Sequence, residues 1–596
     1  MKKLKIIIPV FMIVSCAVIF WMIAGLAFIY STVDRDQMFK YYQIISAKYY
    51  ENFEEDPLTE VNSAVINYQN LYDVKTYSLK LSFDIPDKKI FGIMNMRSLC
   101  LSDTLNFIYI DLSEDLNVNS IKINGDEISN NSYKRKDNLI IADSRGLMDK
   151  DEEFSVEINY EGKPENKGFD SFNIKKFDNE PSIYTLSEPN HAKTWWPCKD
   201  VLTDKADVEV FITVPKKLTA VSNGKLENIL TDENGSKTFH WRSAYPTATY
   251  LVSLAIGYYD SWNDTYTSVD GNIKMPVEYY TYPYLTEKAK IDWKETPEML
   301  SFFSEKFGEY PFIKEKYGMA TFGWVGGAME HQTISSMGYT LVTGNGRYED
   351  VVVHELVHQW YGDAVTPKSW KDIWLNEGFA SYGEALWVEH KNGFDAYKNF
   401  MKKNDYSFFM GTLYDPDGYI FGPTVYKKGS WVLHMLRGVT GDSLFFEILR
   451  TFYEKFKYQN ADTYDFQKVC EDITGNDLKY FFNQWIFTGT GRPEYNFSWT
   501  FDQVNNSQEN SKENSKGNSE TSYKVSINLN QTQEDMEVYS MPLKILFKTS
   551  SGEEEITVFN DKRNQQIDHT LKGKPFDVII DNDNWVLKKI KKEYNN

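Results

Sequence analysis

The stretch His354-Glu355-Leu356-Val357-His358 decides how the rest of this chain is interpreted. Two histidines four positions apart on a helix lie on one face, about one turn from each other, so both imidazoles can reach one ion. Glu377 follows His358 after eighteen intervening residues. Because the chain has only eight histidines, this pairing is a strong signal. It predicts a helix that carries two ligands of a metal ion.

The residue types in this pattern point to zinc. Two imidazoles, one carboxylate and an open fourth position suit a catalytic zinc ion, so we expect His354, His358 and Glu377 to hold one Zn²⁺ per chain. Glu377 stands in the apolar segment 374–380, where a buried carboxylate needs a cation or strong donors. Zinc would polarise a carbonyl group and activate water, and the neighbouring Glu355 would accept the proton. The pattern therefore predicts zinc-dependent hydrolysis.

The composition is that of a multidomain globular protein with an acidic balance of charge. The 596 residues are 42% hydrophobic and 16% aromatic, which suffices for several cores. The formal net charge of -20 argues against nucleic acid as a partner, because phosphate binding needs a basic surface. The four cysteines include no CxxC pair, so we expect free thiols and neither a redox motif nor a cysteine zinc site.

The N-terminus carries an apolar run over 6–30, with three lysines before it. A helix of this length spans about 37 Å, enough to cross a bilayer. The lysines place the N-terminus inside, so we expect a single-pass anchor in the cell membrane and an extracytoplasmic catalytic part. The alternatives are a cleaved signal peptide of a secreted protein and a lipoprotein with its cleavage box at 13–16. Residues 1–30 are thus predicted to be an anchor or signal, and 31–65 a stalk.

Periodicity divides most of the remaining chain into two domains. Apolar and polar residues alternate over 77–85, 154–160 and 208–214, which predicts an N-terminal antiparallel β domain over 66–275. Helical signals dominate 276–490, which we expect to be the catalytic domain. In that domain, Thr296 as N-cap and Pro297 after it predict a helix that runs to Phe307.

Strand patterns return after residue 490. Alternation over 495–501 and again over 525–529 predicts a small C-terminal β-sandwich over 491–596. Between these strands, 503–522 is rich in Asn, Ser, Glu and Lys and has almost no apolar content. Such a segment cannot bury a core, so it is predicted to be a disordered loop. The predicted fold class is α+β and multidomain.

Several separated segments give the chain a resemblance to a known family. In chain order they are Glu188-Pro189, Trp196-Pro197-Cys198-Lys199-Asp200, Gly308-Glu309-Tyr310-Pro311-Phe312, Gly327-Ala328-Met329-Glu330, the zinc motif with Glu377, and Tyr426-Lys427-Lys428-Gly429. Together they resemble the M1 family of gluzincin aminopeptidases over nearly the whole chain beyond the stalk. The resemblance implies a β domain, a thermolysin-like catalytic domain and a β-sandwich. Longer members add a C-terminal helical domain, which this chain is expected to lack.

The resemblance also implies how the substrate is held. Gly327, Ala328, Met329 and Glu330 match the exopeptidase motif, whose glutamate binds the free α-amine of the substrate. A carboxylate at a fixed distance from the zinc would set cleavage after the first residue. The chain departs from the motif at its final position, where His331 replaces the usual asparagine.

Four further positions gain an expected role. Tyr426 matches the tyrosine whose hydroxyl donates to the oxyanion that forms during hydrolysis. Glu188 is expected to be a second acidic contact for the amine. Leu186 stands where many members place a glutamine near the first side chain of the substrate. Asp363, just past the zinc helix, is expected either to orient a ligand histidine or to be a turn residue after Gly362.

The predicted function is therefore a zinc-dependent aminopeptidase acting on peptides with a free N-terminus. One alternative is a zinc endopeptidase of the same broad clan, against which Glu330 argues. Another is a non-catalytic surface binding protein on an aminopeptidase scaffold, against which the complete zinc set argues. An epoxide hydrolase activity, known from one branch of the family, has no separate support in the sequence. No sequence pattern indicates the oligomeric state.

Overall fold

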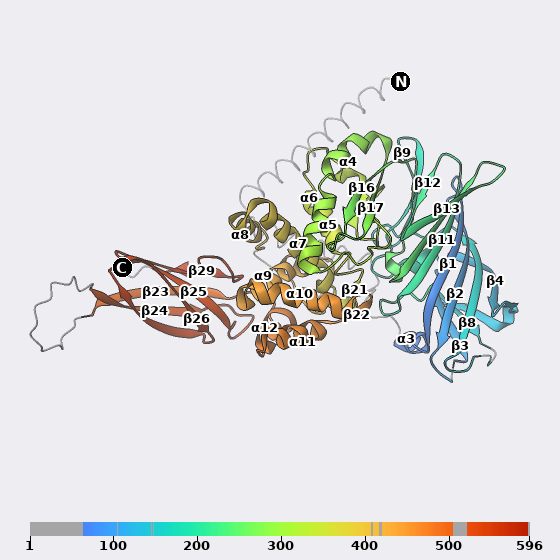
Figure 1. Cartoon of the computed structure of the whole chain (residues 1–596). Helices are drawn as coiled ribbons and strands as arrows, with labels where there is room; N and C mark the ends of the chain where they lie inside the picture. Colours follow the sequence, from blue (N-terminus) through green and yellow to red (C-terminus); the bar gives the residue numbers. More distant parts are fainter. Residues whose placement is uncertain are drawn as a thin grey trace, which may run out of the picture.

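The structure, a computed structural model, describes residues 63–103, 105–144, 146, 148–406, 409–416, 420–504 and 521–593. Figure 1 shows three parts in a row: a β-rich part at the right, a mainly helical part in the middle, and further β-strands at the left. The predicted anchor at 1–30, most of the stalk and nearly all of the predicted loop at 503–522 lie outside the described residues.

The predicted single-pass location in the cell membrane, with an extracytoplasmic catalytic part, is corrected by the described helices. No helix in the described ranges is both long enough and apolar enough to cross a membrane. The 19-residue α7 (Trp374–Asn392) has the length, but it carries Glu377, Glu384 and Glu389. On this finding the prediction was wrong; it rested on the run 6–30, which is outside the described residues.

The largest sheet of the β-rich part has eight strands. Across the sheet they are β13 (Lys225–Thr231), β14 (Lys237–Thr247), β11 (Ala206–Val214), β1 (Tyr72–Asp84), β2 (Lys89–Cys100), β8 (Glu153–Gly162), β4 (Leu116–Ile123) and β5 (Asp126–Glu127). The strands pair antiparallel, as the alternation predicted, except that β1 and β11 run parallel, with Thr76 opposite Asp207. Alternate residues of β1, such as Leu79 and Leu81, are buried in one apolar core.

Two smaller sheets and a short helix complete the β-rich part. They are the sheet of β12 (Thr219–Val221), β15 (Ala255–Gly257), β10 (Glu180–Thr185) and β9 (Phe172–Phe177), the sheet of β3 (Phe107–Asp111), β7 (Leu139–Asp143) and β6 (Tyr133–Lys136), and α3 (Ser63–Gln69). The three cysteines of the described residues, Cys100, Cys198 and Cys470, are buried and free, as predicted. β10 leads to a predicted site residue, because Glu188 follows its last residue by three positions.

The helical part combines a mixed sheet with a set of helices. The sheet holds β16 (Asp260–Thr267), β17 (Lys274–Thr281), β18 (Tyr317–Phe322), β20 (Ser335–Gly338) and β19 (Ala328–Met329), and β21 (Val365–Pro367) pairs with β22 (Gln459–Ala461). The helices are α4 (Thr286–Asp292), α5 (Thr296–Phe307), α6 (Glu349–Val357), α7, α8 (Phe394–Lys403), the π-helical η7 (Thr424–Lys428), α9 (Gly429–Thr440), α10 (Asp442–Phe456), α11 (Thr463–Thr474), α12 (Lys479–Phe482) and the π-helical η8 (Asn483–Phe487).

Helix α5 shows how far local signals reach. It ends at Phe307, as predicted, with Pro297 in its first turn and with Gly308, whose φ of 114° favours glycine, as its C-cap. The predicted N-cap was displaced by one residue, since Glu295 occupies the cap position. Thr296 is instead the first helical residue, and its hydroxyl donates to the carbonyl of Trp293 at 2.7 Å.

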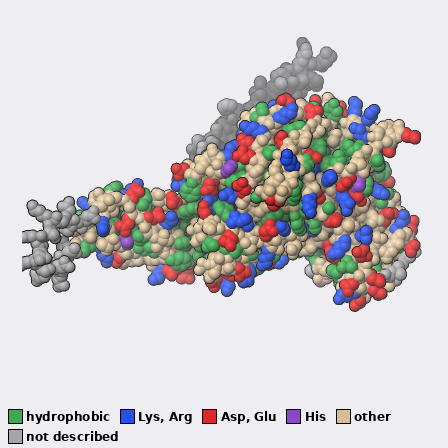
Figure 2. All heavy atoms as spheres, in the orientation of Figure 1, with side chains coloured by type: hydrophobic (Ala, Val, Ile, Leu, Met, Phe, Trp, Pro, Cys, Tyr) green, Lys and Arg blue, Asp and Glu red, His purple; other side chains and the backbone are tan. Residues whose placement is uncertain are grey.

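The C-terminal strands form two sheets. One has β27 (Asn564–Lys572), β24 (Ser522–Gln531), β23 (Glu494–Gln503) and β29 (Lys589–Lys592), and the other has β26 (Gly552–Asn560), β25 (Met541–Thr549) and β28 (Pro575–Ile580). β23 and β24 pair antiparallel, with Tyr495 opposite Gln531. Figure 2 shows acidic and basic side chains interspersed over the visible face of the protein. Some of the protein's charged side chains form ion pairs, as Lys368 does with Asp462 and Asp465.

Candidate metal site and substrate cavity

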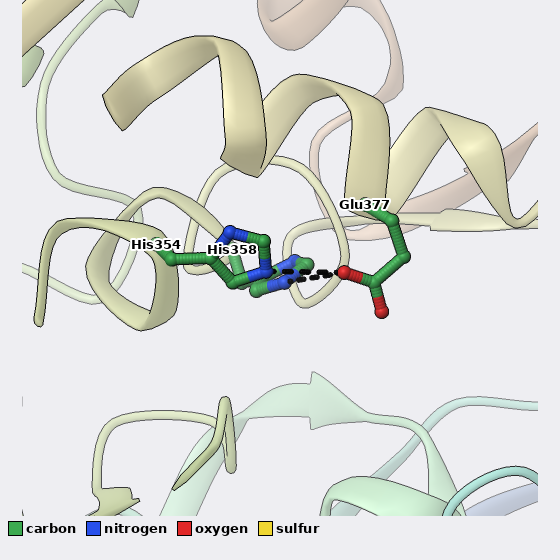
Figure 3. A group of neighbouring side chains, drawn as sticks. All are labelled: His354, His358 and Glu377. Carbon is green, nitrogen blue, oxygen red and sulfur yellow. Dashed lines mark hydrogen bonds and ion pairs between the residues drawn. The ribbon is translucent and has the colours of Figure 1, made fainter. Parts of the chain in front are cut away.

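The three predicted metal ligands come together from two helices. His354 lies on α6, His358 is the residue that follows its last turn, and Glu377 lies in the first turn of α7. Figure 3 shows the three side chains converging on one point. The Oε2 of Glu377 is 3.1 Å from the Nε2 of His354 and 3.4 Å from the Nε2 of His358. The described residues contain this one group of three with metal-ligand spacing.

The donor set fits a zinc ion. Two ligand atoms on a tetrahedral zinc ion, each about 2.0–2.1 Å from it, lie about 3.3 Å apart. The two measured separations of 3.1 Å and 3.4 Å match this spacing. The two Nδ1 atoms are engaged elsewhere, so both Nε2 atoms are free to face the shared position. One ion bound by His354, His358 and Glu377 would keep a fourth position toward the cavity.

Hydrogen bonds behind the ligands fix the two imidazole rings. His354 donates from Nδ1 to the Oε1 of Glu384 at 2.8 Å, and His358 donates from Nδ1 to the carbonyl of Tyr361 at 3.1 Å. Asp363, which we expected to orient a histidine, does not: its buried carboxylate has no hydrogen-bond partner among the described residues. We missed Glu384, although it lies seven residues after Glu377, two turns along the same helix face.

Burial and neighbouring charges shift the acidities at this site in opposite directions. Burial alone raises the pKa of a carboxyl, but His358 and His354 outweigh it and lower the pKa of Glu377 to about 2. For Glu355 burial prevails and raises the pKa to about 8. Burial would lower the pKa of His354, but its hydrogen bonds to Glu377 and Glu384 raise it well above its usual value. Glu377 is therefore the charged ligand, and Glu355 is the carboxyl able to hold a proton near neutrality.

Glu330 and Glu188 lie at the same cavity. Glu330 directly follows β19, and its carbonyl accepts from the Nε2 of Gln359 at 3.1 Å, which ties it to the chain just beyond the zinc helix. Glu188 follows β10 by three residues. Both are buried, and in each the Oε1 has no hydrogen-bond partner among the described residues. Burial, followed for Glu188 by the charge of Glu330, raises the pKa of both carboxyls. A cation bound next to such buried carboxyl groups would stabilise their charged form.

His331, at the position where the motif departs from its relatives, is fully buried. Its Nδ1 is 2.9 Å from the hydroxyl of Ser336 on β20. Burial lowers the pKa of His331 to about 3, so the ring is neutral at physiological pH. It does not line the cavity. His331 therefore supports the strand that carries the motif, and it does not add a charge that changes with pH near neutrality.

Tyr426 reaches the metal site from a π-helical turn. It lies in η7, and its ring stacks on the His354 ring with centroids 5.8 Å apart and planes 16° apart. Behind it, helix α7 and the start of α9 touch at two glycines. A Cβ at Gly378 would lie 2.9 Å from the Cα of Gly429, and one at Gly429 would lie 2.8 Å from the Cα of Gly378. Glycine at both positions permits this close approach.

All the residues predicted to bind the metal, to bind the substrate or to act in catalysis line one cavity of about 460 Å³. His331 and Asp363 do not line it. We call its charged centre the polar cluster, which comprises Glu188, Glu330, His354, Glu355, His358 and Glu377. Gly327, Ala328, Met329 and Tyr426 also line the cavity, as do residues that sequence reasoning did not single out: Phe169, Trp324, Asp350, Glu384, Phe421 and Lys427. The cavity is large enough for the first residues of a peptide.

Two family models match the chain. Residues 73–251 match the Peptidase M1 N-terminal domain, and residues 292–485 match the Peptidase family M1 domain. A probable aminopeptidase 2 from Sulfurisphaera tokodaii is 26% identical over 466 residues, which cover 74% of this chain and 56% of that protein. The chain spans between a third and just over half of the length of the first curated relatives.

Solved structures show the same fold. An M1 zinc metallopeptidase from Deinococcus radiodurans superimposes with a TM-score of 0.61 at 25% identity, covering 70% of this chain and 93% of that one. Aminopeptidase A from Legionella pneumophila gives a TM-score of 0.74 at 17% identity, covering 88% of this chain and 60% of that one. With two family domains matched over more than half of its length, the chain belongs to peptidase family M1.

Proposed function

We propose that this protein is a zinc-dependent aminopeptidase that removes the first residue from peptides. The observation that carries the proposal is the state of Glu188 and Glu330. Each is buried, lines the cavity beside the metal ligands and keeps one carboxylate oxygen without a hydrogen-bond partner among the described residues. A substrate ammonium would supply the missing donors and the compensating charge. No feature of the alternative functions explains why two such carboxylates stand together.

Zinc is the cofactor that this donor set takes, and when bound it supplies Lewis acidity to a carbonyl oxygen and to water. The chain's own groups divide the remaining work. Glu355, which lines the cavity beside the metal ligands, accepts the proton of the attacking water and carries it to the leaving amine. Tyr426 is a neutral donor that stabilises negative charge developing on the carbonyl oxygen. His354, His358 and Glu377 hold the cofactor in place.

The carboxylate pair also sets which peptide bond is cut. When Glu188 and Glu330 bind the α-amine, the first peptide bond comes to the metal site, and a peptide without a free amine leaves two buried carboxylates unpaired. This argues against an endopeptidase, which must accept chain on both sides of the bond. A binding protein without catalysis would not need Glu355 beside the metal ligands. The aminopeptidase is therefore the function best supported by the geometry.

The purified full-length protein, loaded with zinc, should be assayed with two reporters. One is leucine joined through an amide bond to a fluorescent amine, and the other is the N-acetyl derivative of the same compound. We expect hydrolysis of the free-amine reporter and a loss of about a hundredfold or more on acetylation, because hydrogen bonds to two charged groups are lost. Chelation should abolish activity, and one equivalent of zinc should restore it. Equal cleavage of both reporters would indicate an endopeptidase. A protein that binds no zinc and cleaves neither reporter would favour the binding protein.

We also propose a division into three domains, the last of them a β-sandwich over 491–596. The predicted boundary at 275 lies inside β17, which pairs with β16 and β18, so we place the first boundary near Tyr258, between β15 and β16. The two C-terminal sheets support the β-sandwich, since Ile527 of β24 and Ile545 of β25 are fully buried in one apolar cluster. Limited proteolysis should release fragments with ends near residues 258 and 490, because Tyr258 is exposed between β15 and β16.

A further inference from the structure

Part of the cavity lining is apolar. We call it the apolar wall, and it comprises Phe169, Leu186, Trp324, Met329 and Phe421. The Phe169 ring lies 5.9 Å from that of Trp324 and 5.1 Å from that of Phe421, as measured between centroids. Leu186 and Met329 are only 1% and 2% exposed, and they share one apolar cluster against which Phe169 and Trp324 pack. The wall is therefore a continuous surface and not a set of scattered residues.

The wall is held in shape from behind. A Cβ at Gly326 would lie 2.4 Å from the indole of Trp324, so a glycine at that position lets the ring lie directly against the loop backbone. The Phe421 ring also meets Trp370 edge-on, with centroids 6.5 Å apart, and Trp370 in turn meets the buried Tyr250. These contacts fix the wall's rings before a ligand arrives, so less conformational entropy is lost on binding.

The wall adjoins the two carboxylates that are proposed to bind the amine. Met329 directly precedes Glu330, and Leu186 precedes Glu188 by two residues. In a peptide, the α-amine and the first side chain are attached to the same carbon atom. An amine bound between Glu188 and Glu330 therefore places the first side chain two bonds from the bound nitrogen, next to the wall that adjoins both carboxylates. This step rests on the proposed function.

The charges of the cavity disfavour an acidic side chain in that place. Six carboxylates line the cavity: Glu188, Glu330, Asp350, Glu355, Glu377 and Glu384. Among the described lining residues, Lys427 is the only lysine or arginine, and its Nζ lies 3.8 Å from the Oε2 of Glu384. The other carboxylate oxygen of Glu384 accepts a hydrogen bond from His354. Lys427 therefore lies near the metal ligand His354. An added carboxylate at the wall would gain no cation and would meet like charges.

We propose that the apolar wall binds the side chain of the first residue, so that the preferred substrates are peptides that begin with an aromatic or large aliphatic residue. Peptides that begin with Asp or Glu are the poorest substrates. Phe169 is the central specificity residue because it contacts both other rings, and Leu186 keeps the surface apolar next to Glu188. Binding of the first side chain is driven by the removal of apolar surface from water. A small first residue such as alanine buries the least apolar surface and therefore gains the least free energy.

The test measures kcat/KM of the zinc-loaded, full-length protein for the amides of Phe, Leu, Ala, Lys and Glu. We expect Phe and Leu to exceed Ala by about tenfold or more, since each buried methylene contributes to discrimination, and Glu to be lowest. In Phe169→Ala the value for the Phe amide should fall by about tenfold while that for the Ala amide changes less than about twofold. Leu186→Gln, a milder change, should narrow the Phe-to-Ala ratio in the same direction.

Phe576→Ala is the matched control, because Phe576 is 67% exposed on β28, outside the cavity lining. It should leave all five amides unchanged. Preference for Glu or Lys over Phe, or an equal fall for all amides in Phe169→Ala, would overturn the wall proposal while leaving the aminopeptidase in place. Failure to hydrolyse any free-amine reporter, or indifference to N-acetylation, would instead overturn the proposed function and the wall proposal with it.

Discussion

The polar cluster and the apolar wall line one cavity but are built in different ways. The polar cluster stands on or beside regular elements: α6 and α7 carry the metal ligands and Glu355, and Glu330 directly follows β19. The rings of the wall come from three loops, with Phe169 between β8 and β9, Trp324 between β18 and β19, and Phe421 between α8 and η7.

The two regions also differ in what their burial costs. Carboxylates without partners are costly to bury, so the polar cluster is stable only with the cations it is built to receive. The rings of the wall gain free energy from burial, roughly 25 cal/mol per Å² of apolar surface. The residues of the polar cluster thus lie on or beside helices and strands, which are rigid. The rings of the apolar wall, which are proposed to determine selectivity, lie on loops, which tolerate sequence change. Changes in the polar cluster should affect every substrate alike, whereas changes in the wall should affect substrates differently.

The largest effect is expected for Glu355→Gln. Removing the proton acceptor should lower kcat by about a hundredfold to ten-thousandfold. The factor should be the same for the Phe, Leu and Ala amides, because the reaction and not the side-chain contact is changed. Zinc content by elemental analysis and the thermal unfolding curve should stay as in the parent protein. A loss of kcat that differs strongly between the Phe, Leu and Ala amides would contradict the assignment of catalysis to the polar cluster and of selectivity to the apolar wall.

Glu330→Gln should lower kcat/KM by about tenfold to a hundredfold, the value of a hydrogen bond to a charged group. The ratio between free-amine and N-acetyl reporters should shrink, because one of the two amine contacts is gone. Steady-state kinetics on both reporters measure this ratio. Glu287→Gln, at a carboxylate whose side chain is 84% exposed, is the matched control and should change neither rate. An unchanged ratio would show that Glu330 does not recognise the amine.

Glu384→Gln should weaken zinc binding by about tenfold to a hundredfold, since the hydrogen bond that orients His354 loses its charge. Competition with a chromogenic chelator measures the affinity. At saturating zinc, the preference among amides should be unchanged. Asp363→Asn is the matched control: its carboxylate bonds to neither ligand histidine, so zinc affinity should be retained. A stronger effect at Asp363 than at Glu384 would reverse our assignment of the supporting carboxylate.

The smallest effect is expected for Trp324→Ala. Loss of one ring at the edge of the wall should lower kcat/KM for the Phe amide by about threefold to tenfold and leave the Ala amide unchanged. The free energy of zinc binding should not change, because the indole contacts no ligand of the metal. Equal losses for both amides would mean that Trp324 shapes the polar cluster as well as the wall.

The clustering of His354, His358 and Glu377 could be predicted from the sequence because its geometry is local. The spacing of His354 and His358 fixes their common helix face, and the apolar surroundings of Glu377 mark it as a buried charge in need of a cation. Glu384 could have been found by the same helical periodicity. Asp363 was assigned wrongly because the carbonyl of Tyr361, a backbone group with no sequence signal, accepts from His358 instead.

The wall and one β pairing could not be predicted in this way. Phe169 and Trp324 are 155 residues apart, and Trp324 and Phe421 are 97 residues apart. All three lie in loops without periodicity, so only the folded chain reveals their contacts. Most of the antiparallel pairing was predicted from alternation, but the parallel pairing of β1 with β11 was not, because two strands far apart in the sequence can pair in either direction.

The contact between Gly378 and Gly429 has a consequence for the substitutions that this site can accept. Gly378 adjoins the ligand Glu377, and Gly429 lies three residues after Tyr426. A single added methyl group at either glycine would push the two backbones apart and displace the metal ligand and the tyrosine together. The spacing of Glu377 and Tyr426 is therefore set by one backbone contact, which tolerates no added methyl group.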